Sequence, residues 1–407
     1  MNLCAEGAGY VATPAIIAAL RRDRRLADIG AMMTRIAVCC FLLLVCNQIA
    51  YSYLPRSLMG HVSSSSSSST TTTRLRATAL ESKVFEYANF LTNVAMTNPP
   101  KRLATLLALL EMKGEEILVP SDRKSLNPFL VPLSRFKTDK SMLCYIRWPT
   151  QKEDMDLQLV RTTDVGITLV SMGTDQYCHR LVAEMDFYGE KESSKAIELL
   201  NAEGKLYNSG DYVPVLKSGK FNAITDDDLR LVLDRFLLTK VGAFPDCFER
   251  ISTSFLKAGA DVSALVTCER AVSIFYGWGH PLNFHARLMA KIPGREAEAR
   301  DAARAAFGMP VWTIASTMED LDGLAKLAGF TGAPILGEMH KFRASDPRTE
   351  EVGEGLSPCQ VTLDQAAHLM DAVALGQVDG GWEGVRNDLS VKYREGGYPE
   401  ISAFILS

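Results

Sequence analysis

Histidine and cysteine, the residues that most often ligate metals or act as nucleophiles, are scattered along this chain of 407 residues. His280 and His285 are five residues apart, which places them on different sides of a helix and argues against a shared metal ion. Cys178 and His179 are neighbours and face apart for the same reason. No CxxC pair occurs after residue 78, so we expect buried thiols rather than a disulfide framework or a zinc site.

Two further patterns could bind phosphate or a metal. Lys217-Ser218-Gly219-Lys220 ends like a phosphate-binding loop, but Pro214 stands where that motif needs a glycine. The acidic triplet Asp226–Asp228 follows Thr225, and we expect a helix to begin here with Thr225 as its N-cap. The acids would then lie at the positive end of the helix dipole. A metal site at the triplet is the alternative.

A repeated aromatic spacing indicates a different class of function. Phe244, Trp278 and Trp312 are separated by steps of 34 residues, and the chain between them has the pattern of two helical hairpins. The first hairpin carries apolar residues at i, i+3 and i+7, then a turn glycine and two small residues: Phe248, Ile251, Phe255, Gly259, Ala264 and Ala271. The second hairpin slips by one residue from that pattern.

This pattern resembles the tetratricopeptide repeat, whose stacked hairpins bind other polypeptides. An ordinary helical bundle is the alternative. In that family the inner helix displays its polar side to the ligand, and that side here holds Asp246, Glu249, Arg250, Thr253 and Lys257. Members that bind carboxylates carry Lys and Asn where this chain has Glu249 and Thr253, so a chaperone C-terminal peptide is not the implied ligand. Alternatively, these residues form an ordinary solvated helix face.

Trp278 lies between two glycines at the junction of the two hairpins. Core packing is the simpler interpretation of this position. The alternative is an exposed aromatic anchor for a partner, and in that case Trp278 joins the five polar residues as a candidate binding residue.

The hydrophobic periodicity predicts an α+β fold. Alternating apolar and polar residues predict strands at 142–148, 157–161 and 167–170, and a hairpin turn joins the last two. We predict a small α+β domain with a short antiparallel sheet over residues 79–190. Only helical patterns follow, so we assign 191–315 to an all-α domain of tetratricopeptide-like hairpins and 316–407 to a C-terminal helical extension.

The first 78 residues have the composition of a targeting leader. A short positive start and the apolar segment 36–50 predict a signal peptide at about 33–52. Residues 53–78 are rich in Ser, contain Arg and lack acids, which is typical of a plastid transit peptide. Together they resemble the bipartite leaders of algae with secondary plastids. A secreted protein with a Ser/Thr-rich linker is the alternative.

The body of the chain is acidic: residues 79–407 hold 36 Lys and Arg against 45 Asp and Glu. This balance argues against a nucleic-acid partner, which normally requires a basic surface. No apolar run after the leader reaches the length of a membrane span, so any thylakoid contact would be peripheral.

With its leader and its hairpin pattern, the chain loosely resembles the low-photosystem-II-accumulation type of plastid assembly factor. The resemblance implies a stromal or thylakoid-surface protein without a cofactor. It would bind other plastid proteins, such as photosystem subunits or assembly factors, and assist the assembly or maintenance of photosynthetic complexes. The alternative is a stromal enzyme with a site between the α+β domain and the helical region, built from groups such as His179, Asp186 or His280.

Overall fold

The computed structural model describes residues 70–151, 155–218, 225–330, 335, 337–339 and 357–407. Most of the predicted leader, residues 1–69, therefore lies outside the described residues. All contacts reported below lie within the compact unit that includes Thr78–Ser407.

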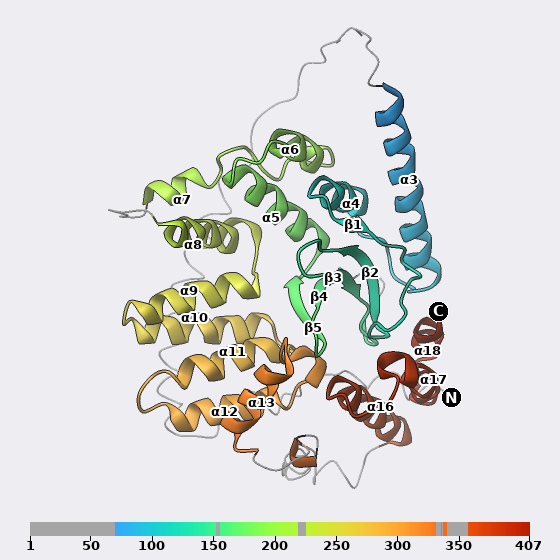
Figure 1. Cartoon of the computed structure of the whole chain (residues 1–407), viewed down its shortest axis with the longest axis vertical. Helices are drawn as coiled ribbons and strands as arrows, with labels where there is room; N and C mark the ends of the chain where they lie inside the picture. Colours follow the sequence, from blue (N-terminus) through green and yellow to red (C-terminus); the bar gives the residue numbers. More distant parts are fainter. Residues whose placement is uncertain (1–69, 152–154, 219–224, 331–334, 336, 340–356) are drawn as a thin grey trace. The chain divides into compact units, whose positions relative to one another are not determined.

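A five-stranded antiparallel sheet forms the centre of this unit, with its strands in chain order (Figure 1). The strands are β1 (Glu116–Ile117), β2 (Leu130–Arg135), β3 (Met142–Ile146), β4 (Gln158–Thr162) and β5 (Ile167–Ser171). The three predicted strands correspond to β3, β4 and β5, and the α+β fold class is confirmed. Strand β2 is not predicted from the sequence, because it is buried on both faces and therefore lacks the alternation of apolar with polar residues.

Helices cover both faces of the sheet. Val131, Leu143 and Tyr145 point into one apolar core, together with residues of the helices that flank the strands in sequence. Those helices are α3 (Thr70–Asn93), α4 (Leu103–Met112), α5 (Thr174–Phe187), α6 (Ser193–Asn201) and α7 (Val213–Ser218). Leu130 and Ile146 point into the opposite core, which is built by later helices. Strict alternation along each strand divides the apolar residues between the two cores.

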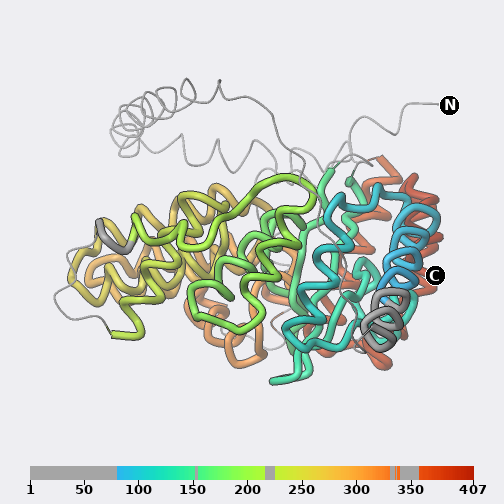
Figure 2. The backbone as a smooth tube through the Cα atoms, turned by 90° about the horizontal axis from the view of Figure 1, so that it is seen from above, coloured from blue at the N-terminus to red at the C-terminus, as the bar shows by residue number. Residues whose placement is uncertain are grey.

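The second core depends on the C-terminal helices, which are α16 (Pro358–Ala374), α17 (Gly381–Glu395) and α18 (Pro399–Leu406). Arg123, in the loop before β2, donates a hydrogen bond to the Phe404 carbonyl at 2.6 Å and lies 3.9 Å from the centre of its ring. Arg386 of α17 in turn donates to the Arg123 carbonyl. Figures 1 and 2 both place α18 beside α3, where Phe404 contacts Phe90. Burial and the charge of Arg386 lower the pKa of Arg123 to about 9.

A stack of helical hairpins follows the α+β region (Figure 1). The helices are α8 (Asp226–Phe236), which continues as a π-helical turn (Leu237–Val241), α9 (Pro245–Lys257), α10 (Asp261–Ile274), α11 (Gly279–Met289), α12 (Glu296–Ala306), a 3₁₀ turn (Val311–Thr313) and α13 (Met318–Ala328). Helix α9 pairs with α10 and α11 pairs with α12, and the second helix of each pair also packs on the first helix of the next. Gly259 takes the predicted left-handed conformation after α9, with φ +71°.

Two of the three aromatic residues spaced by 34, Phe244 and Trp278, occupy equivalent places in this stack, and the third does not. Phe244 and Trp278 directly precede α9 and α11, and Trp312 lies in the 3₁₀ turn after α12. All three are buried. The helical hairpins of the prediction are therefore present, whereas membership of the tetratricopeptide family stays a prediction.

The β4–β5 turn meets this stack at Gly166. A Cβ atom on Gly166 would lie 2.1 Å from the Trp312 carbonyl oxygen, and the neighbouring Asp164 amide donates to the Ser316 carbonyl at 3.2 Å. The turn can approach the helical region this closely only without a side chain at 166.

We therefore expect Gly166→Ala to lower the free energy of unfolding by about 2 kcal/mol through overpacking. Urea denaturation monitored by circular dichroism measures the change. Gly323→Ala is the control, because the atom nearest to its Cβ would be a side-chain nitrogen of Arg287, at 3.0 Å, rather than a backbone atom. Equal stability of the two variants would contradict the close contact.

Candidate protein-binding site

Two of the predicted binding residues, Asp246 and Arg250, form ion pairs inside the fold. The Arg180 guanidinium of α5 donates a hydrogen bond to each oxygen of the Asp246 carboxylate, at 2.8 and 2.6 Å. Arg250 binds Asp234 of α8 with two hydrogen bonds of 2.7 Å and also reaches Asp246 at 2.9 Å. These contacts hold α9 against α5 and α8.

The pairs belong to a larger ion network of three arginines and three carboxylates: Arg180, Glu184, Arg230, Asp234, Asp246 and Arg250. Arg230 closes the network by reaching Glu184 at 3.0 Å and Asp234 at 3.3 Å. Burial alone would raise the pKa of Asp246, but the two arginines beside it hold that pKa well below its usual range. The network is electrically balanced, and the carboxylate of Asp234 is fully buried within it.

Glu249, Thr253 and Lys257 follow along the same helix. The Glu249 carboxylate accepts a hydrogen bond from His280 Nε2 of α11 at 2.8 Å, which joins the first hairpin to the second. Burial alone would lower the pKa of His280, but the hydrogen bond and charge of Glu249 raise it. Thr253 is half-buried and Lys257 is exposed. Of the five polar residues on α9, four are half-buried and Lys257 is exposed, and a role for this set in binding a partner stays a prediction.

Trp278 is only 3% exposed and packs edge to face on Trp148, with the ring centroids 5.5 Å apart. Trp148 also contacts Trp312, at 5.3 Å. Glycine is required on each side of Trp278 for a different reason. Gly277 has φ +88°, and a Cβ on Gly279 would lie 2.5 Å from the Ile314 side chain. The core-packing interpretation therefore describes Trp278 in this structure.

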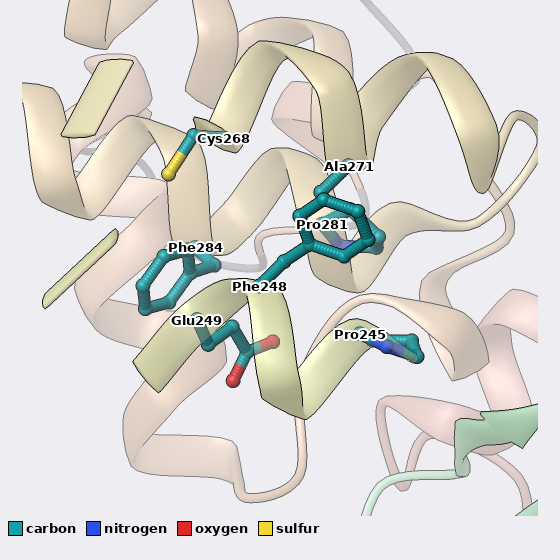
Figure 3. Close-up of a pocket in the computed structure, with 7 residues that line it drawn as sticks. All are labelled: Pro245, Phe248, Glu249, Cys268, Ala271, Pro281 and Phe284. Carbon is teal, nitrogen blue, oxygen red and sulfur yellow. The ribbon is translucent and has the colours of Figure 1, made fainter. Parts of the chain in front are cut away.

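A small cavity lies between α9, α10 and α11, and Figure 3 shows its lining. Phe248, Pro281, Phe284 and Cys268 form most of its wall, and Glu249 is the one charged residue there. Its volume is about 10 Å³, which is room for about one water molecule and too little for a substrate.

The side chains considered for catalysis have other partners or unsuitable protonation states. Burial raises the pKa of the Cys178 thiol well above its usual range and that of Cys268, beside the cavity, to about 11, so both thiols are poor nucleophiles at neutral pH. Asp186 accepts hydrogen bonds from Tyr207 and from the 209–210 turn, and His179 packs edge to face on the Tyr207 ring. His280 donates a hydrogen bond to Glu249, as described above. These three residues each support local structure.

The acidic triplet lies at the start of a helix, and half of the phosphate-loop-like motif lies outside the described residues. Thr225 and Asp228 form a reciprocal capping box at the start of α8, which confirms the predicted cap. In the described part of the chain, no three His, Cys, Asp or Glu side chains come together as a metal site would require. Lys217 and Ser218 end α7, and the rest of that motif lies outside the described residues. Every described helix is too short or too polar to span a bilayer.

We expect Asp234→Asn to lower the free energy of unfolding by about 3 kcal/mol, because it leaves the arginine charges around it without a buried partner. Chemical denaturation measures the loss. Asp227→Asn, at an exposed position of the same helix, should change the stability by less than about 0.5 kcal/mol. Similar losses in both variants would show that the network does not anchor α8.

The raised pKa of His280 predicts a pH dependence. A protonated His280 stabilises the folded state below its unfolded pKa of about 6.5, and this contribution is lost as the pH rises through the higher folded value. Denaturation between pH 6 and about 8.5 should therefore show a decline that His280→Gln removes. Burial lowers the pKa of His285 to about 4, so His285→Gln should act in the opposite sense and at lower pH. An unchanged profile in His280→Gln would rule out this contribution.

Comparison with known proteins gives matches along almost all of the described chain. Residues 85–220 match the family model described as PAB N-terminal, residues 245–331 the PAB middle domain, and residues 337–407 the PAB C-terminal domain. Trp278, Trp312 and α9 to α13 fall within the middle-domain match, and Phe244 directly precedes it. No solved structure matches the chain.

One curated relative covers the same region. It is the Protein IN CHLOROPLAST ATPASE BIOGENESIS, chloroplastic, of Arabidopsis thaliana, which is 33% identical over 357 residues. The match spans 86% of this chain and 98% of the relative. A similarity to a plastid biogenesis protein is thus confirmed, although that protein is not of the photosystem type that the sequence resembled. On the matches to its three domains, the chain belongs to the PAB family.

Proposed function

We propose that this chain is a non-catalytic, protein-binding factor of the plastid that assists biogenesis of the chloroplast ATPase. The observation that carries the proposal is the extent of the match, because the similarity spans 98% of the relative that is named for this role. A match limited to one helical segment would support only a shared fold.

Two features support a role in binding rather than catalysis. The stacked hairpins offer extended helix surfaces of the kind on which helical arrays bind other polypeptides. The cavity between α9, α10 and α11 has room for about one water molecule, and the cysteine that lines it has a raised pKa. The partner in this proposal is a subunit of the ATPase during its assembly.

We place the protein in the stroma or at the thylakoid surface, imported by the leader at 1–78. The acid-free, Ser-rich composition of residues 53–78 and the chloroplast location in the relative's name support this placement. Nucleic acid is not a partner in the proposal, because the body of the chain is acidic.

Removal of the gene from the source cells tests the proposal. We expect the amount of assembled chloroplast ATPase, measured by native gels and quantitative immunoblots, to fall several-fold while its subunits are still synthesised. Re-expression of the full chain should restore it.

Photosystem II, measured in the same membranes, is the control, because the loose resemblance of the sequence indicated that complex instead. A loss of photosystem II with a normal amount of ATPase would show that photosystem II, and not the ATPase, is the complex whose assembly depends on this chain. Normal levels of both complexes would refute a role in their assembly.

A further inference from the structure

Helix α10 has a buried apolar face and, on the opposite side, two exposed valines. Ala264, Cys268 and Ala271 are buried against α9 and α11, as expected for the inner face of a hairpin helix. On the outer face, Val262 is 72% exposed and Val266 is 52% exposed. Exposed positions of a surface helix are normally polar, and the described part of the chain leaves these two valines largely uncovered.

Helix α12, the second helix of the next hairpin, has charged residues on its exposed face and small residues on its buried face. The exposed residues of α12 include Glu296, Arg300 and Asp301, and the buried ones are alanines. The outer face of α10 is therefore not a general property of the stack.

The outer face of α10 has the spacing of a helix–helix seam. Its residues follow one another in steps of 4, 3, 4 and 3: Val262, Val266, Glu269, Ser273 and Tyr276. We call these five residues the α10 seam. Tyr276 lies just beyond the end of the helix and is 49% exposed, so the seam has an apolar residue at each end. The spacing is that of the a and d positions along which one helix packs on another, although Glu269 and Ser273 are polar.

The charge at the centre of the seam limits what can cover it. Glu269 is exposed, and the charges that act on it, Arg295 and Glu298, are paired with each other at 2.6 Å. In a symmetric antiparallel pair of two copies centred on the seam, Glu269 would face its own copy, and two like charges would repel. An anionic membrane would be repelled in the same way. A helix with a Lys or Arg at the central position would instead form an ion pair.

We propose that the α10 seam docks an amphipathic helix of another polypeptide, with apolar residues at heptad spacing and a Lys or Arg opposite Glu269. In taking that polypeptide to be an ATPase subunit, the inference rests on the proposed function. The chemistry of the seam itself does not depend on that identity.

A designed peptide tests the chemistry directly. The probe is a helical peptide of about three heptads with Leu at the a and d positions and a single Lys at the centre, and its matched version has Glu there. The full chain should bind the Lys peptide about tenfold more tightly than the Glu peptide, and Glu269→Lys should reverse this preference. Val262→Gln/Val266→Gln should weaken binding of both peptides by about tenfold or more.

The control carries the same two substitutions at exposed valines of other helices, Val361→Gln/Val391→Gln, and should bind like the unmodified chain. Equal binding by the seam variant and the control would overturn the proposal. So would self-association, or binding to anionic vesicles, that depends on the two seam valines while peptide binding does not. Circular dichroism should show equal folding of all variants, because every changed side chain is exposed.

The same variants in cells that lack the native gene separate this inference from the proposed function. The control should restore the ATPase fully, whereas the seam variant and Glu269→Lys should restore it several-fold less. If the seam variants restore the ATPase as well as the control does, the docking site is wrong and the proposed function stands. If the unmodified chain does not restore the ATPase, the proposed function is wrong, and the peptide measurement alone decides on the seam.

Discussion

The sheet is covered on both faces, and this constraint determines how the rest of the chain is arranged. An antiparallel sheet commonly leaves one face to solvent, and its strands then alternate between apolar and polar residues. Here β2 and β3 are apolar on both sides, so each strand needs two helical layers. The helices next to the strands in sequence supply one layer. The second layer is built from the hairpin stack and the C-terminal helices, so the α+β region acquires its second core only with the last part of the chain.

The ion network has a different role from the two cores. A buried, balanced set of charges adds little stability over apolar residues of the same size, because the cost of removing the charges from water offsets their attraction. It does require one geometry, since each arginine reaches two carboxylates in a fixed direction. The network thus defines how α9, the first helix of the first hairpin, is oriented on α5 and α8. Through the contact between Glu249 and His280, the second hairpin follows from the first.

The sequence predicted the features that depend on local spacing. Three strands, the cap at Thr225 and the glycine turn after α9 each depend on residues within a few positions of one another. It could not predict β2, where burial of both faces removes the alternation and Pro132 interrupts a β pattern. The ion pairs of α9 were also hidden, because Arg180 is 66 residues from Asp246. From the helix period alone, a polar face that meets arginines of another helix cannot be distinguished from one that meets solvent.

The contact between Arg123 and Phe404 closes a loop of 281 residues. Contacts over such distances form late, because the entropy of the intervening chain must be lost before they contribute. During synthesis, the N-terminal strands emerge long before α16 to α18 do. One apolar side of the sheet is then exposed to water and prone to aggregation. Until the last helices have been synthesised, the apolar side chains of the second core therefore lack part of the layer that covers them in the folded protein.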